Sequence, residues 1–600
     1  MRLLDWIVLV LSLVLIVGYG LYKSRGSGTI RGYILADKTM PWWAMGLSIM
    51  ATQASAITFV GTTGQAYVDG MRFVQFYFGL PLAMVIISAV AVPFFHKARV
   101  VTAYEFLEQR FDAKTRLAAS IVFLIQRGLG VGLALYAPAV VLSVILGWSE
   151  RATVLIMAGI VVSYAVPGGI KAVTWTDVQQ MILIFLGIAG AFLTAVLLLP
   201  SEVSFGDALY LAGASGRLNA VDLSFDPNNR YTLWSGLIGG MFLALSYFGC
   251  DQSQVQRYLT GKSIAHSRTS LIFNAIVKVP LQFFILLTGA MVFVFYQFEK
   301  PPMLFNKAEA TKFEQALLNQ GVEGPPIGSG PQGGGQAGAS PVSEQYQEAL
   351  RQYDQALEQR QDVARRLLEA RRNGVPPPEG SGAQGGSGNS GASPEELRAA
   401  NRGVEDARKR GIQVLREVNG GKDYDDTNYI FLTFVTRYFP VGAVGLIIAA
   451  IFAAAMSTIS AELNSLATIT MMDIYRRHFR REASETHYVR VAKTATAFWG
   501  LYAAVFASFG GRLGSLIEAV NMVGSLFYGS LLGVFVLAFG FPRVTGTGAF
   551  AGMIVGEIAV LLTSWLTGIS FLWYNVVGCV VVVAVGVAVS QFSINPLHEK

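Results

Sequence analysis

The stretch "PWWAMGLSIMATQASAITFVGTTG", residues 41–64, has the length and composition of a membrane-crossing helix, but small and polar residues at 51–55 interrupt it halfway. A helix that unwinds inside a bilayer exposes backbone carbonyls and amides, and transporters use these groups to bind solutes and ions near the midplane. A second stretch, "YTLWSGLIGGMFLALSYFGCDQ" at 231–252, is rich in glycine and reaches Asp251. We therefore predict two broken helices; the alternative is that the small residues only allow close helix packing.

Thirteen apolar runs of this kind can be counted along the chain. Of its 600 residues, 53% are hydrophobic and 14% are charged, and the mean hydropathy is +0.47. About 20 apolar residues suffice to cross about 30 Å of hydrocarbon, so the sequence predicts an all-α polytopic membrane protein with about thirteen transmembrane helices. The runs lie at about residues 3–22, 41–63, 73–96, 117–147, 152–167, 178–199, 231–250, 270–297, 441–475, 489–510, 514–540, 548–567 and 571–591.

The two broken runs are the second and the seventh, so they lie five spans apart. This spacing suits two inverted repeats of five spans each, with one extra span before them and two extra spans after them. Five divisions are predicted. They are an N-terminal span with a cytoplasmic loop (residues 1–40), the first repeat with the first two spans of the second (41–299), an extracytoplasmic insertion (300–427), the rest of the second repeat (428–540), and the C-terminal spans with a short tail (541–600).

The insertion, residues 300–427, contains no apolar span. It holds two patches rich in Gly, Pro and Ser, which are flexible linkers by composition, and two charged segments of good helix formers. We predict a solvated helical hairpin, or a pair of mobile helices, outside the cytoplasm. Binding of a partner protein by these helices is the alternative.

The distribution of Lys and Arg among the short loops predicts the orientation of the chain. Cation-rich loops such as "YKSRGSGTIRG" and "RRHFRREASETHYVR" are expected in the cytoplasm, which puts the N-terminus outside and the C-terminus inside a plasma (inner) membrane. The net charge of +7 is then a result of topology, and no nucleic acid is expected as a partner. The sequence has no HExxH motif, nucleophile elbow or phosphate-binding loop, so we do not expect an enzyme.

A polar cluster, "FAAAMSTISAELNS" at residues 452–465, lies within the apolar run 441–475. Because unpaired polar groups are costly in a bilayer, the cluster is expected to bind something; the alternative is that its hydroxyls bond to carbonyls of their own helix. Sodium takes oxygen ligands, and helical spacing places a carbonyl and two hydroxyls of this run within about one turn. Carbonyls freed by the break at 51–55 would complete a cage. The predicted sodium ligands are Ala51, Ala54, Ala454, Ser457 and Thr458.

Several motifs follow one another over nearly all of the chain outside residues 300–427. They are "PWWAMGLSIMATQASAITFVG", "YEFLEQRF", "YAPA", "GGIKAVTWTDVQQ", "DQSQVQRYL" and "MSTISAELNSLATITMMDIYR". With these motifs the chain resembles the sodium–solute symporter family, which implies a LeuT-type inverted-repeat fold and a sodium site at the same five residues. Within that family it is most similar to the branch that carries monocarboxylates, vitamins and iodide.

The resemblance leaves a second sodium site open. Some members hold a second ion with an acidic residue after the "WT" pair and two further hydroxyls on the long helix. Asp177 and Ser460 match this pattern and Gln180 lies nearby, whereas Ala461 occupies the position of the second hydroxyl. The alternative role for Asp177 is an ion pair with Arg257 that gates the cytoplasmic side.

The resemblance also places a solute pocket among the second, third, fourth, seventh, eighth and eleventh spans. Sugar-carrying relatives have acidic and amide side chains where this chain has Tyr77 and Ala244, which disfavours a sugar. Lys278 either pairs with a solute carboxylate or binds carbonyls of a broken helix, since a cation inside a membrane needs a partner. The positions implied to face the pocket are Thr58, Phe76, Tyr77, Tyr136, Ala244, Tyr247, Lys278 and Phe527.

These patterns together predict a sodium-coupled secondary symporter that imports a small solute, with a small organic anion favoured, by alternating access. Two alternatives stay open: a transporter-fold sensor that binds a partner through residues 300–427, and a symporter for a sugar or an amino acid. The expected partners are Na+, the solute and membrane lipid, and a monomer suffices for this function.

Overall fold

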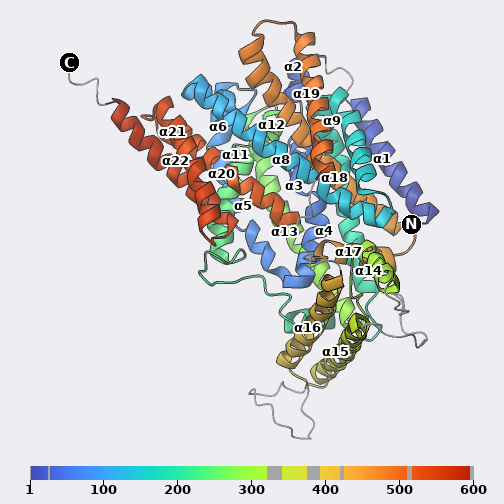
Figure 1. Ribbon diagram of the computed structural model, residues 1–600. Helices are drawn as coiled ribbons and strands as arrows, with labels where there is room; N and C mark the ends of the chain where they lie inside the picture. Colours follow the sequence, from blue (N-terminus) through green and yellow to red (C-terminus); the bar gives the residue numbers. More distant parts are fainter. Residues whose placement is uncertain are drawn as a thin grey trace.

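The protein is a bundle of tilted helices with one helical hairpin projecting from its end (Figure 1). The computed structural model describes residues 2–23, 28–319, 341–374, 392–418, 424–509 and 516–594. Within these ranges the chain forms helices and loops and no β-strand. Each of the thirteen apolar runs coincides with one or more helices, which confirms the all-α polytopic architecture.

The helices of the first part of the bundle precede a long loop at residues 215–232. They are α1 (Leu3–Lys23), α2 (Ile30–Leu35), a 3-10 helix (Ala36–Lys38), α3 (Trp42–Gln53), α4 (Ala56–Asp69), a second 3-10 helix (Gly70–Tyr77), α5 (Leu80–Ala89), α6 (Ala91–Ala98), α7 (Ala103–Arg110), α8 (Ala113–Leu146), α9 (Glu150–Leu197) and α10 (Phe205–Ala214).

The second part begins after this loop with a π-helical turn and ends near the C-terminus. Its helices are the turn Ser235–Gly239, α11 (Gly240–Gly249), α12 (Gln252–Leu259), α13 (Ile264–Phe298), α14 (Lys307–Asn319), α15 (Pro341–Arg372), α16 (Pro394–Val418), α17 (Thr427–Tyr438), α18 (Ala443–Ile469), a π-helical segment (Thr470–Phe479), α19 (Glu485–Ser508), α20 (Leu516–Gly540), α21 (Gly546–Leu566) and α22 (Phe571–Ile594).

The second and seventh apolar runs are both broken, as predicted. In the second run α3 ends at Gln53, Ala54 leaves the helical region with φ −83° and ψ 63°, and the Ser55 side chain caps α4 by accepting the Thr58 amide. In the seventh run α11 ends at Gly249, and the carboxylate of Asp251 caps α12. Short polar side chains at these positions satisfy the backbone donors that a helix start leaves unbonded, so the breaks are encoded locally.

Nine helical segments of the described chain are long and apolar enough to cross a membrane by length and composition. Two of them, Ala56–Ala98 and Glu150–Leu197, have 43 and 48 residues and include parts of two predicted runs each. The second segment turns at Gly169, where φ is 55° and a Cβ would clash with the carbonyl oxygen of Tyr33. The number of thirteen passes therefore stays a prediction.

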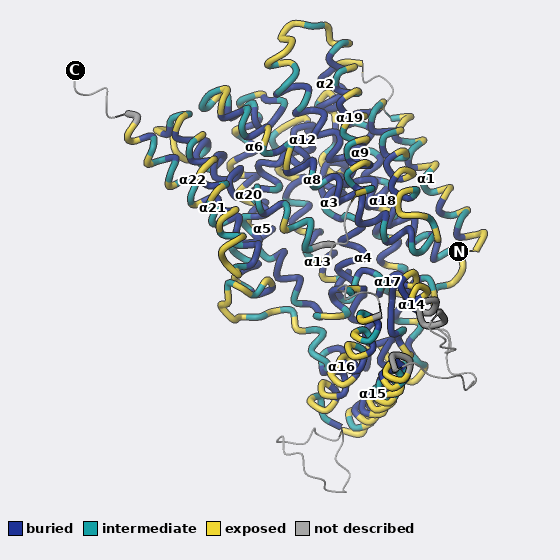
Figure 2. The backbone as a smooth tube through the Cα atoms, viewed as in Figure 1, coloured by how far each residue is buried: buried dark blue, intermediate teal, exposed yellow. Residues whose placement is uncertain are grey.

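Helix α18 is the centre of the bundle. It packs against α1, α3, α4, α8, α9 and α19, and almost every side chain from Val444 to Ile469 is buried. Helices α1, α21 and α22 lie at the periphery and expose large apolar side chains such as Leu11, Val14 and Trp565 (Figure 2). Exposed apolar surface on the outer helices, around a buried central helix, is what a lipid environment requires.

Helices α15 and α16 form the projecting hairpin, which lies close to α14 and α17 (Figure 1). The sequence predicted solvated helices here, but the hairpin also packs against α10 and α13 of the bundle. Tyr353 and Leu357 of α15 and Val404 of α16 are buried in a small apolar cluster with Met303. The charged composition of the two helices concealed this one apolar face.

Candidate functional site

The break between α3 and α4 lies against the polar cluster of α18. Thr458 donates its hydroxyl to the carbonyl of Thr52, at 3.0 Å, and to the carbonyl of Ala454, at 3.3 Å. Ala51, Ala54, Ala454, Ser457 and Thr458 are all buried. The Thr458–Thr52 bond thus joins the last turn of α3, next to Ala51 and Ala54, to the turn of α18 that carries Ala454, Ser457 and Thr458; sodium binding by these five residues stays a prediction.

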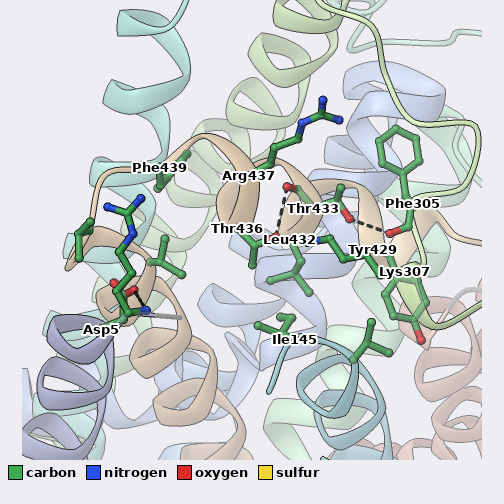
Figure 3. Close-up of a pocket in the computed structure, with 14 residues that line it drawn as sticks. Asp5, Ile145, Phe305, Lys307, Tyr429, Leu432, Thr433, Thr436, Arg437 and Phe439 are labelled. Carbon is green, nitrogen blue, oxygen red and sulfur yellow. Dashed lines mark hydrogen bonds between the residues drawn. The ribbon is translucent and has the colours of Figure 1, made fainter. Parts of the chain in front are cut away.

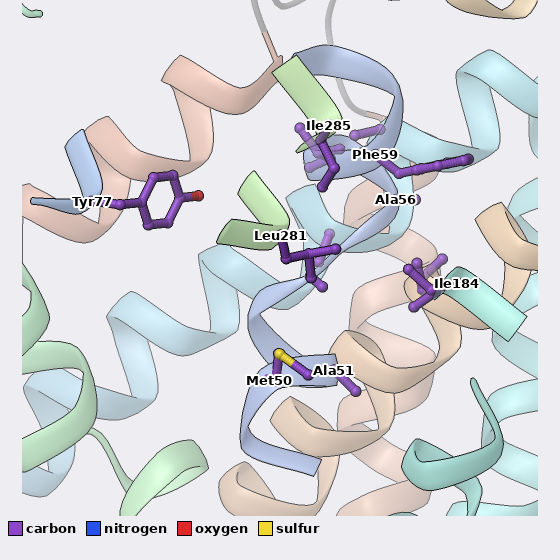
Figure 4. Packing of buried hydrophobic residues seen from close by; sticks show 14 of the residues in the cluster. Met50, Ala51, Ala56, Phe59, Tyr77, Ile184, Leu281 and Ile285 are labelled. Atoms are coloured by element: carbon purple, nitrogen blue, oxygen red, sulfur yellow. The ribbon is translucent and has the colours of Figure 1, made fainter. Parts of the chain in front are cut away.

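The backbone at the break leaves two oxygens available. Within the described residues, no hydrogen bond is accepted by the carbonyls of Ala51 or Ala54, whereas the Met50 carbonyl accepts the Ala54 amide at 2.8 Å. Apolar side chains of α4, α9 and α13, including Phe59, surround this region (Figure 4). Buried backbone carbonyls are normally bonded, so two free ones at one break are a place where a cation can be coordinated.

Asp177 of α9 connects α3, which ends at the first break, to α12, which begins at the second. Its carboxylate accepts hydrogen bonds from Ser48 at 2.5 Å, from Ser457 at 2.7 Å and from Arg257 at 2.9 Å. Asp177 and Arg257 are fully buried and form an ion pair. The three donors come from α3, α18 and α12, so one carboxylate joins both broken helices to the central helix.

The residues named for a second sodium ion lie on two helices, Asp177 and Gln180 on α9 and Ser460 on α18. Ser460 donates its hydroxyl to the carbonyl of Ser457 at 3.1 Å, within its own helix. Gln180 is buried and both of its amide atoms lack a hydrogen-bond partner in the described structure. Ala461 is buried and its side chain carries no oxygen. A second site at these positions stays a prediction.

Three of the residues predicted to face the solute lie together beside the middle of α13. The ammonium of Lys278 lies 5.5 Å from the centre of the Tyr77 ring, and the Tyr77 and Phe76 rings are 5.0 Å apart. Tyr247 accepts a hydrogen bond from Gln254 at 2.7 Å, and its ring lies 6.0 Å from that of Tyr528.

The other predicted pocket residues lie on different elements. Thr58 bonds to the carbonyl of Gln53 at 3.3 Å and so lies at the break itself. Tyr136 is on α8, Ala244 on α11 and Phe527 on α20. A cavity of about 250 Å³ lies elsewhere, between the start of α1 and α17 (Figure 3), and none of the eight residues lines it.

A polar stripe on α13 was missed by the sequence interpretation. Asn274, Lys278 and Gln282 follow one another at intervals of four residues and are fully buried. In the described structure the Lys278 ammonium, both amide atoms of Asn274 and the amide oxygen of Gln282 have no hydrogen-bond partner. Because residues four apart share a helix face, the spacing itself could have revealed the stripe.

A buried charge network was also missed. The guanidinium of Arg127, on α8, donates to Glu462 of α18 and to Tyr528 of α20, both at 2.7 Å, and forms an ion pair with Asp251. The second carboxylate oxygen of Glu462 has no partner in the described residues. One cation therefore faces two carboxylates. The signal was present, since Arg127 is a charge within an apolar run.

The sodium:solute symporter family matches residues 33–309 and 416–556. The chain is 26% identical over 564 residues to a sodium-dependent multivitamin transporter of Oryctolagus cuniculus, covering 93% of this chain and 69% of that protein. It is 24% identical over 576 residues to sodium-coupled monocarboxylate transporter 2 of Bos taurus, covering 95% and 73%.

The fold has a solved counterpart. A structure of a Na+-coupled sialic acid symporter in a substrate-bound, outward-open state superimposes with a TM-score of 0.71, at 23% identity and over 98% of both chains. This similarity confirms the LeuT-type fold that the motifs implied. The family match, the two broken helices and the central polar helix agree, and the chain belongs to the sodium:solute symporter family.

Proposed function

We propose that the protein imports a small organic anion together with Na+, by alternating access between the two sides of the membrane. The observation that carries this proposal is the break between α3 and α4, where the carbonyls of Ala51 and Ala54 accept no hydrogen bond within the described residues and the neighbouring Thr52 carbonyl accepts the Thr458 hydroxyl of α18. Sodium coordinates oxygen, and such a site offers oxygens without requiring a net charge.

The sodium ion would be held between the two broken-helix carbonyls of Ala51 and Ala54 and three oxygens of α18. Thr458 already bridges α18 and the unwound segment, which supports a spacing that one cation can span. The Ser457 hydroxyl donates a hydrogen bond to Asp177, so binding of an ion at Ser457 would change the surroundings of the Asp177–Arg257 pair. This link supports a role for the pair as a gate that responds to sodium.

One sodium ion is expected to bind strongly, and the second at best weakly. Ser460 is bonded within its own helix and Ala461 has no hydroxyl, so a sodium titration of transport should give a Hill coefficient of about one. Ala461→Ser should raise the coefficient or tighten sodium binding. A wild-type coefficient of about two that is lost in Asp177→Asn, but unchanged in Ala461→Ser, would contradict this assignment.

The solute is proposed to be an anion because of Lys278. This lysine is fully buried, and in the described residues its ammonium has neither a hydrogen-bond partner nor a carboxylate within ion-pair distance. A buried charge without a partner is unfavourable, and a solute carboxylate beside the aromatic ring of Tyr77 would compensate it. Relatives described as monocarboxylate and multivitamin transporters support a small organic anion.

Replacing Lys278 by methionine tests this role. Loss of one charged hydrogen bond to a carboxylate, about 1.5–3 kcal/mol, should raise the KM for lactate by about 10-fold or more. The unfolding temperature should stay unchanged or rise, because the variant buries no unpaired charge. A marked fall of the unfolding temperature would show instead that Lys278 holds the broken helix together.

The orientation is also proposed rather than fixed by the fold. Asp5 of α1 accepts hydrogen bonds from the amides of Gly442 and Gly445, so the N-terminus lies at the end of the bundle where α18 begins. The insertion enters the bundle at that same end through α17. Cation-rich loops at the opposite end support placing the N-terminus and the insertion outside, and the C-terminus inside, a plasma (inner) membrane.

A further inference from the structure

The hairpin of α15 and α16 covers a cavity at the end of the bundle. The cavity has a volume of about 160 Å³, well above the roughly 10–15 Å³ that a single water needs. It is bounded by the ends of α4 and α13, by the start of α17 and by the facing sides of α15 and α16. The family match covers residues 33–309 and 416–556, so the hairpin lies outside the matched ranges.

The charges around this cavity are not balanced. Arg217 pairs with Glu405 at 2.9 Å, and Arg408 pairs with Asp426 at 2.6 Å. These two pairs use both carboxylates that line the cavity. The remaining buried cation is Arg360.

Arg360 lies on α15 and is only 3% exposed. Its guanidinium donates to the carbonyl of Tyr296, whereas its Nε has no partner and no carboxylate of the described residues lies within ion-pair distance. Burial lowers the pKa of Arg360, because the nearby groups do not offset the loss of hydration. A buried guanidinium that lines a cavity and lacks a counter-ion is suited to receive an anion.

The walls beside Arg360 are aromatic. Tyr67 lies with its ring 5.6 Å from Phe293 and 5.9 Å from Phe305, and Tyr353 closes the side formed by α15. Such walls suit the carbon skeleton of a ligand, while a few polar groups set its orientation. A bare inorganic ion would leave these walls without contact.

We propose that this cavity is an additional binding site for a small organic monocarboxylate, whose carboxylate contacts Arg360 and whose carbon skeleton contacts the aromatic walls. Tyr67 lies nine residues beyond Thr58 on α4, which corresponds to about 13 Å along the helix. Phe293 likewise lies 15 residues beyond Lys278 on α13, so the site is separate from the break and from Lys278. If the proposed function and orientation hold, the cavity lies on the side from which the solute enters. Binding to the cavity itself requires neither.

The test is binding of lactate to the purified full-length protein, with sodium replaced by choline at constant ionic strength. Without sodium the central site should contribute little, so saturable lactate binding reports on the cavity. Arg360→Met should weaken this binding at least 10-fold. Arg351→Met, on an exposed face of the same helix, should leave it unchanged.

Lactamide, the neutral counterpart of lactate, provides a test on the unaltered protein. It should bind at least 10-fold more weakly than lactate in the same sodium-free buffer, whether or not Arg360→Met folds. Binding that needs sodium and is unaffected by Arg360→Met, or equal binding of lactamide and lactate, would overturn the proposal. A protein that binds lactate without sodium but never transports it would refute the proposed function and leave this site standing.

Discussion

Sodium-dependent uptake of lactate should fall by about 100-fold or more when Ser457 and Thr458 are both replaced by alanine. Each hydroxyl is proposed to contact the ion, and a contact to a charged group contributes about 1.5–3 kcal/mol, so the two together reach the roughly 3 kcal/mol that such a loss requires. The hydroxyl of Thr458 also bonds to the broken segment at Thr52. Uptake into proteoliposomes, compared at saturating and at low sodium, measures the effect.

Ser465 provides the matched control, because it is buried on the same helix and its hydroxyl bonds to the carbonyl of Glu462 at 2.8 Å. Ser465→Ala should change uptake by no more than about twofold, since a hydroxyl bonded within its own helix contributes little. If Ser465→Ala lowered uptake as much as the double variant, the loss would reflect damage to α18. Unchanged uptake in the double variant would remove Ser457 and Thr458 from the sodium site.

Replacing Arg127 by methionine should destabilise the protein by about 3–5 kcal/mol, the cost of leaving a buried ion pair without one partner. Two carboxylates, Asp251 and Glu462, would lose their common cation, and Tyr528 would lose its donor. The change in the free energy of unfolding can be measured by denaturant titration of the purified protein. Because Arg127 joins α8 to α12, α18 and α20, movement between these helices should also become easier.

Glu462→Gln distinguishes a charge effect from a packing effect. The network holds one cation and two carboxylates, so neutralising Glu462 leaves a balanced Arg127–Asp251 pair. This single variant should change stability by less than about 1 kcal/mol, and adding it to Arg127→Met should restore part of the loss. A cost as large as that of Arg127→Met would show that the network requires both negative charges.

The broken helices could be predicted because their causes are local. Residues 51–55 place a serine cap beside small residues, and Asp251 caps the following helix, so each break is encoded by its own few residues. The polar cluster of α18 could be predicted for a similar reason. Helical spacing alone puts Ala454, Ser457 and Thr458 on one side of the helix.

The packing of the insertion and the buried charge network around Arg127 could not be predicted in this way. Composition marked α15 and α16 as solvated because most of their residues are charged, and only the structure shows that Tyr353, Leu357 and Arg360 point into a shared interior. The partners of Arg127 lie 124 and 335 residues away in the chain. Such pairings depend on how distant helices pack, and they leave no signal in the local spacing of residues.

The most direct test of the central claim is the sodium dependence of thermal unfolding, because it requires no knowledge of the solute. A ligand that binds only the folded protein stabilises it by about 2.7 kcal/mol at 100 times its Kd. We expect Na+ to raise the unfolding temperature of the wild type in a saturable way, while K+ and choline at equal ionic strength do not. The Ser457→Ala, Thr458→Ala double variant should lose this response and Ser465→Ala should keep it. An equal response to K+, or an undiminished sodium response in the double variant, would contradict the proposed site.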